Sequence, residues 1–187
     1  MPIPTRLPRE KILSIGEEVA KAFSYTDDFN IERVVDELGG RIVPNDFWDN
    51  LAKTGSLEVT GLRDFDIFIP NHTTHERDRF TIAHELGHYI LHYLSNVGPQ
   101  ANSKFRIDRY GNSAIEREAN LFASSFLMPE GQFRDVFAQF SGDLSAVAMR
   151  FGVSEVTAQV RAKMLGLHAE RKPKAVGSAA DISAAQA

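Results

Sequence analysis

The chain has 187 residues, a formal net charge of −4 and a sequence pI near 5.9. With 43% hydrophobic and 25% charged residues, its composition is that of a globular protein with one well-buried domain. The acidic balance argues against non-specific nucleic-acid binding, and the absence of cysteine excludes disulfides and thiolate metal ligands. The sequence contains neither a signal-peptide pattern nor an apolar run of about 20 residues, so we expect a cytoplasmic protein without a membrane span.

The first 70 residues predict two helices followed by short strands. The predicted elements are helices over residues 9–23 and 31–38, strands over 41–44, 57–62 and 66–69, and a turn or short helix over 46–53. Arg63 and Asp64 are the expected hairpin connection between the last two strands. Because Pro70 cannot donate to a ladder, the last strand ends there or lies at a sheet edge. An exposed edge at residues 66–70 would bind an extended peptide by β-augmentation, and an inert edge is the alternative.

The most informative feature is the motif His84-Glu85-Leu86-Gly87-His88 within an apolar helix expected to run to Leu94. His84 and His88 are four residues apart, so they lie on one helix face and can bind the same ion. Glu85 is rotated from them by roughly a third of a turn, where it can act as general base to a metal-bound water. Zn²⁺ is the expected cofactor, because two histidines and a carboxylate leave an open position for a water with a pKa of about 7.

The start of this helix has its own signal. Thr73 and Glu76, three residues later, match a capping box, so Thr73 is the expected N-cap. Candidates for a donor to the developing oxyanion are Tyr89, His92, His75 and Tyr110, and the sequence does not choose among them. We expect His92, four residues after His88, to pack or hydrogen-bond in a structural role rather than to bind metal.

A third ligand must come from Asp, Glu or His elsewhere, because the residues after His88 do not continue the metzincin pattern. The helix predicted over residues 114–127 opens with two candidates, Glu116 and Glu118. We favour Glu116, because it shares a helix face with Asn120, which would then hold a ligating histidine through its second ring nitrogen. Glu118 stays open as the alternative. Whichever acid is not a ligand is expected to be a solvated residue of the first helical turn.

The C-terminal part predicts a helix over residues 130–140 and then a helical pair around Gly152 that resembles a helix-turn-helix. We expect a peptidase domain at residues 1–140, the helical pair at 141–168 packed on or next to it, and a disordered tail at 169–187. DNA reading would use Gln159, Arg161 and Lys163 of the second helix. On an acidic protein, packing or partner recruitment is the favoured role, so we expect no direct DNA binding.

Three segments together resemble the ImmA/IrrE family of zinc metallopeptidases. They read RFTIAHELGHYILH at residues 79–92, EREANLFA at 116–123 and FLMP at 126–129, and the resemblance extends over about residues 28–167. It implies an α+β fold: a zincin-like helical core, a small twisted β-sheet packed on the motif helix and a C-terminal helix-turn-helix-like pair. It also implies His84 and His88 as metal ligands, Glu85 as the base, and a Glu of segment 116–118 as the third ligand.

The same resemblance implies a function. Members of the family act in bacteria and mobile elements, where they cleave helix-turn-helix repressors and switch on repressed genes, including stress-response genes. The leading hypothesis is therefore a zinc-dependent, site-specific endopeptidase that cleaves a repressor of the XRE type. The alternative is a metal-containing anti-repressor that sequesters its partner without cleaving it. A general peptidase, or the toxin side of a two-gene module, is a weaker third interpretation.

Overall fold

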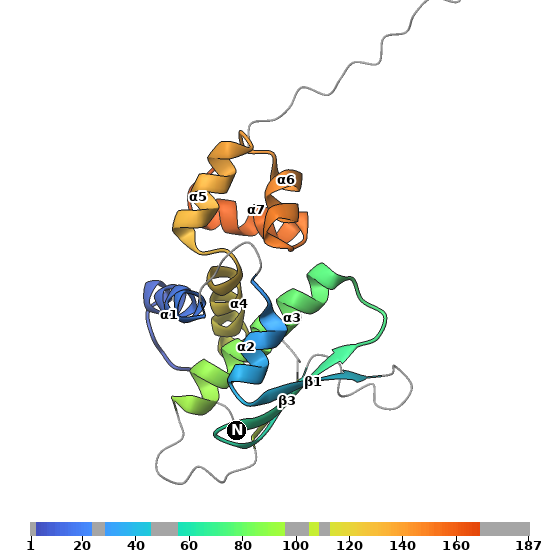
Figure 1. Cartoon of the computed structure of the whole chain (residues 1–187). Coiled ribbons are helices and arrows are strands. Elements are labelled where there is room, and N and C mark those ends of the chain that lie inside the picture. The colour runs from blue at the N-terminus through green and yellow to red at the C-terminus, as the bar shows by residue number, and fades with distance from the viewer. Residues whose placement is uncertain (1–2, 24–28, 46–55, 96–104, 109–112, 169–187) are drawn as a thin grey trace, which may run out of the picture.

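The computed structural model describes residues 3–23, 29–45, 56–95, 105–108 and 113–168. The turn predicted at 46–53, Tyr110 and the tail predicted at 169–187 lie outside these residues. The helices are α1 (Arg9–Ala22), α2 (Ile31–Glu37), α3 (His75–Gly87), the π-helix η1 (His88–Leu94), α4 (Ala114–Leu127), α5 (Glu130–Gln139), α6 (Leu144–Phe151) and α7 (Glu155–Met164). The strands are β1 (Gly40–Asn45), β2 (Ser56–Gly61), β3 (Asp64–Pro70) and β4 (Phe105–Asp108). The fold is α+β, as predicted (Figure 1).

The strands form one mixed sheet in the order β1-β3-β2-β4. β2 and β3 pair antiparallel, so the hairpin predicted around Arg63 is confirmed. β3 also pairs with β1 in parallel, so the predicted free edge at residues 66–70 is wrong. Pro70 is the last residue of β3, where its missing N–H does not interrupt the ladder before it. The edge strands of the described sheet are β1 and β4, and the sequence predicted no strand at the position of β4.

One face of the sheet packs on the helix that carries the motif. Leu57 and Val59 of β2 and Phe65 and Ile67 of β3 are fully buried there. The Phe65 ring stacks on Tyr89 of η1 with the ring centroids 4.1 Å apart. This packing agrees with the arrangement that the family resemblance implies.

The motif helix differs from prediction at both ends. Its N-cap is Thr74, whose hydroxyl accepts from the Arg77 amide at 3.4 Å, whereas the Thr73 hydroxyl contacts Asp78 and the Pro70 carbonyl. Only Thr73 has Glu76 at the capping-box spacing, so the predicted N-cap is wrong by one residue. At the other end the α-helix ends at Gly87 and continues as the π-helix η1. Single-turn π-helices are rare and concentrate at functional sites.

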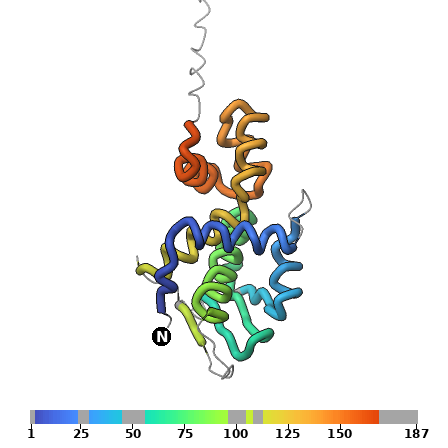
Figure 2. The backbone as a smooth tube through the Cα atoms, turned by 90° about the vertical axis from the view of Figure 1, so that its left-hand side faces the viewer, coloured from blue at the N-terminus to red at the C-terminus, as the bar shows by residue number. Residues whose placement is uncertain are grey.

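α4 lies against both α1 and the motif helix, as Figures 1 and 2 show from two directions. Glycines permit this close approach. A Cβ at Gly16 of α1 would lie 2.8 Å from the Phe122 carbonyl oxygen, and one at Gly87 would lie 3.1 Å from the Phe122 ring. Backbones that approach this closely bring the first turn of α4 next to the histidines of α3.

Helices α5, α6 and α7 form a helical lobe beyond the end of α4 (Figure 1). The predicted turn is confirmed, because Gly152 adopts φ +61° at the end of α6 and Ser154 caps α7 through the Thr157 amide. Arg161 is buried, pairs with Glu17 of α1 at 2.8 Å, and donates to the Met128 carbonyl at 2.9 Å. The Arg161 side chain is therefore buried at this junction and does not lie on the exposed face of α7. Within the described ranges, no helix has the length and apolar character needed to cross a membrane.

Candidate metal centre

Three helical elements bring three potential metal ligands to one point. α3 supplies His84, η1 supplies His88, and α4, capped by Ser113, supplies Glu116 from its first turn. His84 Nε2 lies 3.0 Å from His88 Nε2. The Glu116 carboxylate lies 3.2 Å from His84 Nε2 and 3.3 Å from His88 Nε2.

These distances test whether the residues fit the expected ion. Ligand atoms bound tetrahedrally to zinc at 2.0–2.1 Å are about 3.3 Å apart. The three separations match this value within a few tenths of an ångström. Two imidazole nitrogens and a carboxylate oxygen are also a donor set that suits zinc. The residues present therefore fit a small divalent metal ion, and His84, His88 and Glu116 are the group of this kind found among the described residues.

The structure separates the two acidic candidates on α4. The Glu116 carboxylate faces the two histidines, whereas the Glu118 carboxylate lies 2.8 Å from His92 Nε2. The expectation that the second acid is solvated is wrong, because Glu118 is only 8% exposed. Burial acts to raise the pKa of Glu118, but hydrogen bonds from Thr5 and His92 outweigh it and lower the pKa, so that Glu118 is a carboxylate.

The hydrogen bond expected from Asn120 is present. Its Oδ1 lies 2.9 Å from His84 Nδ1. An amide oxygen only accepts, so His84 Nδ1 carries the proton and its Nε2 keeps a lone pair directed at the centre. This is the partner that metal-bound imidazoles nearly always have.

The electrostatics of the centre favour neutral imidazole beside an ionised acid. Burial lowers the pKa of His88 to about 4, against the opposing effect of Glu116. Burial alone would raise the pKa of Glu116, but hydrogen bonds with His84 and His88 outweigh it and lower the pKa well below its usual range. A metal requires this combination, deprotonated histidine and ionised carboxylate.

The predicted base and the candidate oxyanion donors lie in different surroundings from the three potential ligands. Glu85 is fully buried on the same helix as the two histidines. Tyr89 donates to the Leu62 carbonyl and packs on the sheet, and His92 contacts His88 and Glu118, so both oxyanion candidates have other partners. His75 is exposed at the start of α3. The sequence predicted a hydrogen-bonding role for His92 but missed its partner Glu118, because that pairing depends on the π-helical turn.

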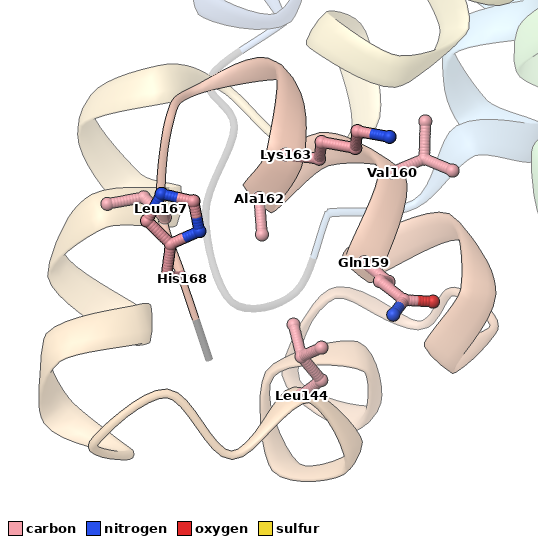
Figure 3. Close-up of a pocket in the computed structure, with 7 residues that line it drawn as sticks. All are labelled: Leu144, Gln159, Val160, Ala162, Lys163, Leu167 and His168. Atoms are coloured by element: carbon pink, nitrogen blue, oxygen red, sulfur yellow. The ribbon is translucent and has the colours of Figure 1, made fainter. Parts of the chain in front are cut away.

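A separate cavity of about 610 Å³ lies in the helical lobe. Figure 3 shows Leu144 of α6 on one side and Gln159 and Ala162 of α7 on the other. Gln159 and Lys163, two of the side chains considered for DNA reading, line this cavity. None of the metal-centre residues lines it, so it is not part of the candidate site.

Comparisons with known proteins agree with this site. The sequence profile of the IrrE N-terminal-like domain matches residues 53–163, which include the motif helix and α4. Over 98 residues the chain is 29% identical to the metallopeptidase ImmA of Bacillus subtilis (strain 168), which covers 51% of this chain and 55% of that protein.

A solved structure titled as a Mycobacterium tuberculosis transcriptional regulator shares the fold, with a TM-score of 0.56 and 18% identity. The match covers 88% of this chain and 48% of that one, so the chain spans about half the length of both relatives. The profile match covers more than half of the chain and contains the HExxH helix together with Glu116. The chain therefore belongs to the ImmA/IrrE family of metallopeptidases.

Proposed function

We propose that the protein is a zinc-dependent, site-specific endopeptidase that cleaves a helix-turn-helix repressor of the XRE type and thereby derepresses its genes. One observation carries this proposal: two imidazole nitrogens and a carboxylate converge within 3.0–3.3 Å, next in sequence to the buried Glu85. That combination suits metal-assisted hydrolysis of a peptide bond.

In the proposed mechanism each residue has one task. His84, His88 and Glu116 hold the metal, which when bound polarises the scissile carbonyl and acidifies the attacking water. Glu85 accepts the proton of that water and passes it to the leaving amine. Asn120 keeps His84 in the tautomer whose Nε2 is available.

Two observations support a repressor as the substrate. The first is membership of the ImmA/IrrE family, since the resemblance to this family implies cleavage of helix-turn-helix repressors. Moreover, a net charge of −4 favours encounter with a DNA-binding protein, whose DNA-contacting surface is basic. We place the protein in the cytoplasm, where such repressors act.

Glu85→Gln tests this function, because it removes the base while keeping the size of the side chain. We would compare newly formed protein N-termini in the natural host cells producing either the wild-type protein or the variant. The expected result is one new terminus in a DNA-binding repressor, present with wild type and absent with Glu85→Gln. Metal analysis of both purified proteins should give the same zinc content.

The alternative is binding of the repressor without cleavage. The enclosed centre favours it, because His84, Glu85 and His88 are at most 1% exposed and a substrate needs access. In that case no terminus depends on Glu85, and the repressed genes respond equally to both versions. Many new termini in unrelated proteins would instead indicate a general peptidase.

A further inference from the structure

Behind His88, away from Glu116, the structure holds a row of hydrogen-bonding groups that the proposed mechanism does not use. His88 Nδ1 lies 3.0 Å from His92 Nδ1, and His92 Nε2 lies 2.8 Å from Glu118 Oε2. The carboxylate of Glu118 also accepts from the Thr5 amide at 2.9 Å and the Arg6 amide at 3.3 Å. The row thus joins the N-terminal segment to a candidate metal ligand.

The direction of each hydrogen bond follows from the end of the row. Both oxygens of Glu118 accept backbone amide hydrogens, Oε2 from Thr5 and Oε1 from Arg6, so His92 Nε2 donates to Oε2 as well. A neutral His92 then has a bare Nδ1, which can only accept. His88 Nδ1 must therefore carry a proton and donate to His92. As a result, His88 Nε2 has a lone pair, and this nitrogen faces His84 and Glu116.

We propose that His92 and Glu118 are positioning residues that fix the tautomer and ring orientation of His88, and that the amides of Thr5 and Arg6 hold Glu118 in place. We call this row of groups, which runs from these two amides through Glu118 and His92 to His88, the relay. The proposal rests on the metal ligands assigned above. It extends the familiar arrangement in which a metal-bound histidine donates to a carboxylate, by inserting a second histidine between them.

The relay explains how both histidines can present lone pairs to a cation. Asn120 fixes the tautomer of His84 and the relay fixes that of His88, so both Nε2 atoms present lone pairs. Together with the Glu116 carboxylate, three electron-rich groups then face one another at 3.0–3.3 Å. Zinc binding requires these tautomers, in which no proton lies between the three groups. In the metal-free protein the hydrogen bonds of His84 and His88 with Glu116 place protons there, and a bound cation would replace them.

The π-helix helps to place His92 between His88 and Glu118. η1 begins at His88, and its wider turn changes the direction of every side chain after it compared with an α-helix. His92 is fully buried and His88 is fully buried, so both ring nitrogens of each need partners. The relay supplies those partners, which an ordinary apolar packing role for His92 would not.

The test measures zinc affinity by competition with a chromophoric chelator. We expect His92→Phe and Glu118→Ala each to weaken zinc binding about 10- to 100-fold, the usual effect of losing such a partner. Glu118→Gln retains one acceptor oxygen and should lose less. Because the two residues act in series, the double variant should be no weaker than the worse single variant. Glu130→Gln, which alters an exposed acid paired with Arg134, is the matched control and should bind as wild type.

A spectroscopic readout distinguishes positioning from simple loss of packing. In the zinc-loaded wild type, ¹⁵N NMR should detect the His88 Nδ1 proton as a slowly exchanging ring N–H. In zinc-loaded His92→Phe this proton loses its acceptor and should exchange rapidly. The visible spectrum of the Co²⁺-substituted protein should shift in the same variants and remain unchanged in Glu130→Gln.

The outcomes separate this inference from the proposed function. If His84→Ala loses zinc but His92→Phe and Glu118→Gln bind like Glu130→Gln, the relay is wrong and the metal centre stands. If His84→Ala also retains zinc, the metal centre itself is wrong. Should Glu118→Ala fail to fold, Glu118→Gln still decides the matter, since it is nearly the same shape.

The N-terminal part of the relay has its own test. Thr5→Pro removes one amide donor to Glu118 and should weaken zinc binding less than Glu118→Ala does. Thr5→Ser keeps both the amide and a hydroxyl, so it should bind zinc as wild type does. Equal affinities of the two variants would show that the N-terminal segment is not part of the relay.

Discussion

Charged and polar side chains are buried both at the metal centre and where the helical lobe meets the rest of the protein, but in opposite arrangements. At the metal centre His84, His88 and Glu116 direct electron-rich atoms at one another. At the lobe, Arg161 meets the Glu17 carboxylate and the Met128 carbonyl, so every contact joins opposite charges or a donor and an acceptor. The ligand groups of the metal centre need a bound cation for full stability, whereas the contacts of Arg161 need no further group.

This difference indicates separate roles. Arg161 joins α7 to α1 and to the end of α4, so its hydrogen bonds fix the position of the lobe. The candidate metal centre gathers buried ligand groups that would be fully satisfied only with a bound ion. Removing side chains in the two regions should therefore have different consequences.

The largest effect on folding should come from the lobe. Glu17→Ala leaves the guanidinium of Arg161, which is 1% exposed, without its carboxylate and should cost about 3 kcal/mol of unfolding free energy. Arg161→Met removes the charge and keeps much of the volume, while the partly exposed Glu17 remains in contact with water. Its cost should be about 1 kcal/mol. Urea denaturation of both variants measures this asymmetry, and equal losses would contradict the role assigned to Arg161.

Adding metal should stabilise the centre by a comparable amount. At a free zinc concentration 100 times the dissociation constant, binding to the folded state adds about 2.7 kcal/mol relative to protein with chelator. His84→Ala should show no such gain. Glu17→Ala should show the full gain, since its ion pair lies apart from the centre. A zinc-dependent gain in His84→Ala would mean that the ion binds elsewhere.

The smallest effects should come from two glycines. A Cβ at Gly87 would lie 3.2 Å from Ala119 backbone atoms, so Gly87→Ala should cost about 1–2 kcal/mol and weaken zinc binding by displacing α4. Gly131 of α5 has nothing within 4 Å of such a Cβ. Gly131→Ala should therefore stabilise the lobe by about 0.5 kcal/mol, through helix propensity alone. Thermal melts and zinc titrations of both variants test this contrast.

Local patterns predicted the elements where a single signal dominated. The 3.6-residue periodicity placed α4 at the bounds that the structure has, and Gly152 with Ser154 marked the turn between α6 and α7. The HExxH spacing brought His84 and His88 to one face before any fold was known. Even the hydrogen bond from His84 Nδ1 to Asn120 followed from the position of Asn120 four residues after Glu116.

Where local signals were weak or equal, the sequence was misleading. β4 is four residues long in a polar segment, and the capping-box spacing from Thr73 to Glu76 pointed one residue before the observed N-cap, Thr74. The position of β3 in the sheet depends on its pairing with β1, more than 20 residues earlier, which no alternation pattern reveals. The prediction that β3 lies at an edge of the sheet depended on Pro70 alone.

By itself, then, the sequence determined which side chains can bind a metal and which helices carry them, because helical geometry fixes the relation of residues three or four apart. The tertiary structure decided what those helices meet. It chose Glu116 rather than Glu118 for the centre, gave Glu118 to His92, and brought Thr5 and Arg6 to the same carboxylate. These contacts join residues up to 113 positions apart, and they depend on how closely backbones pack and where one helix widens into a π-turn.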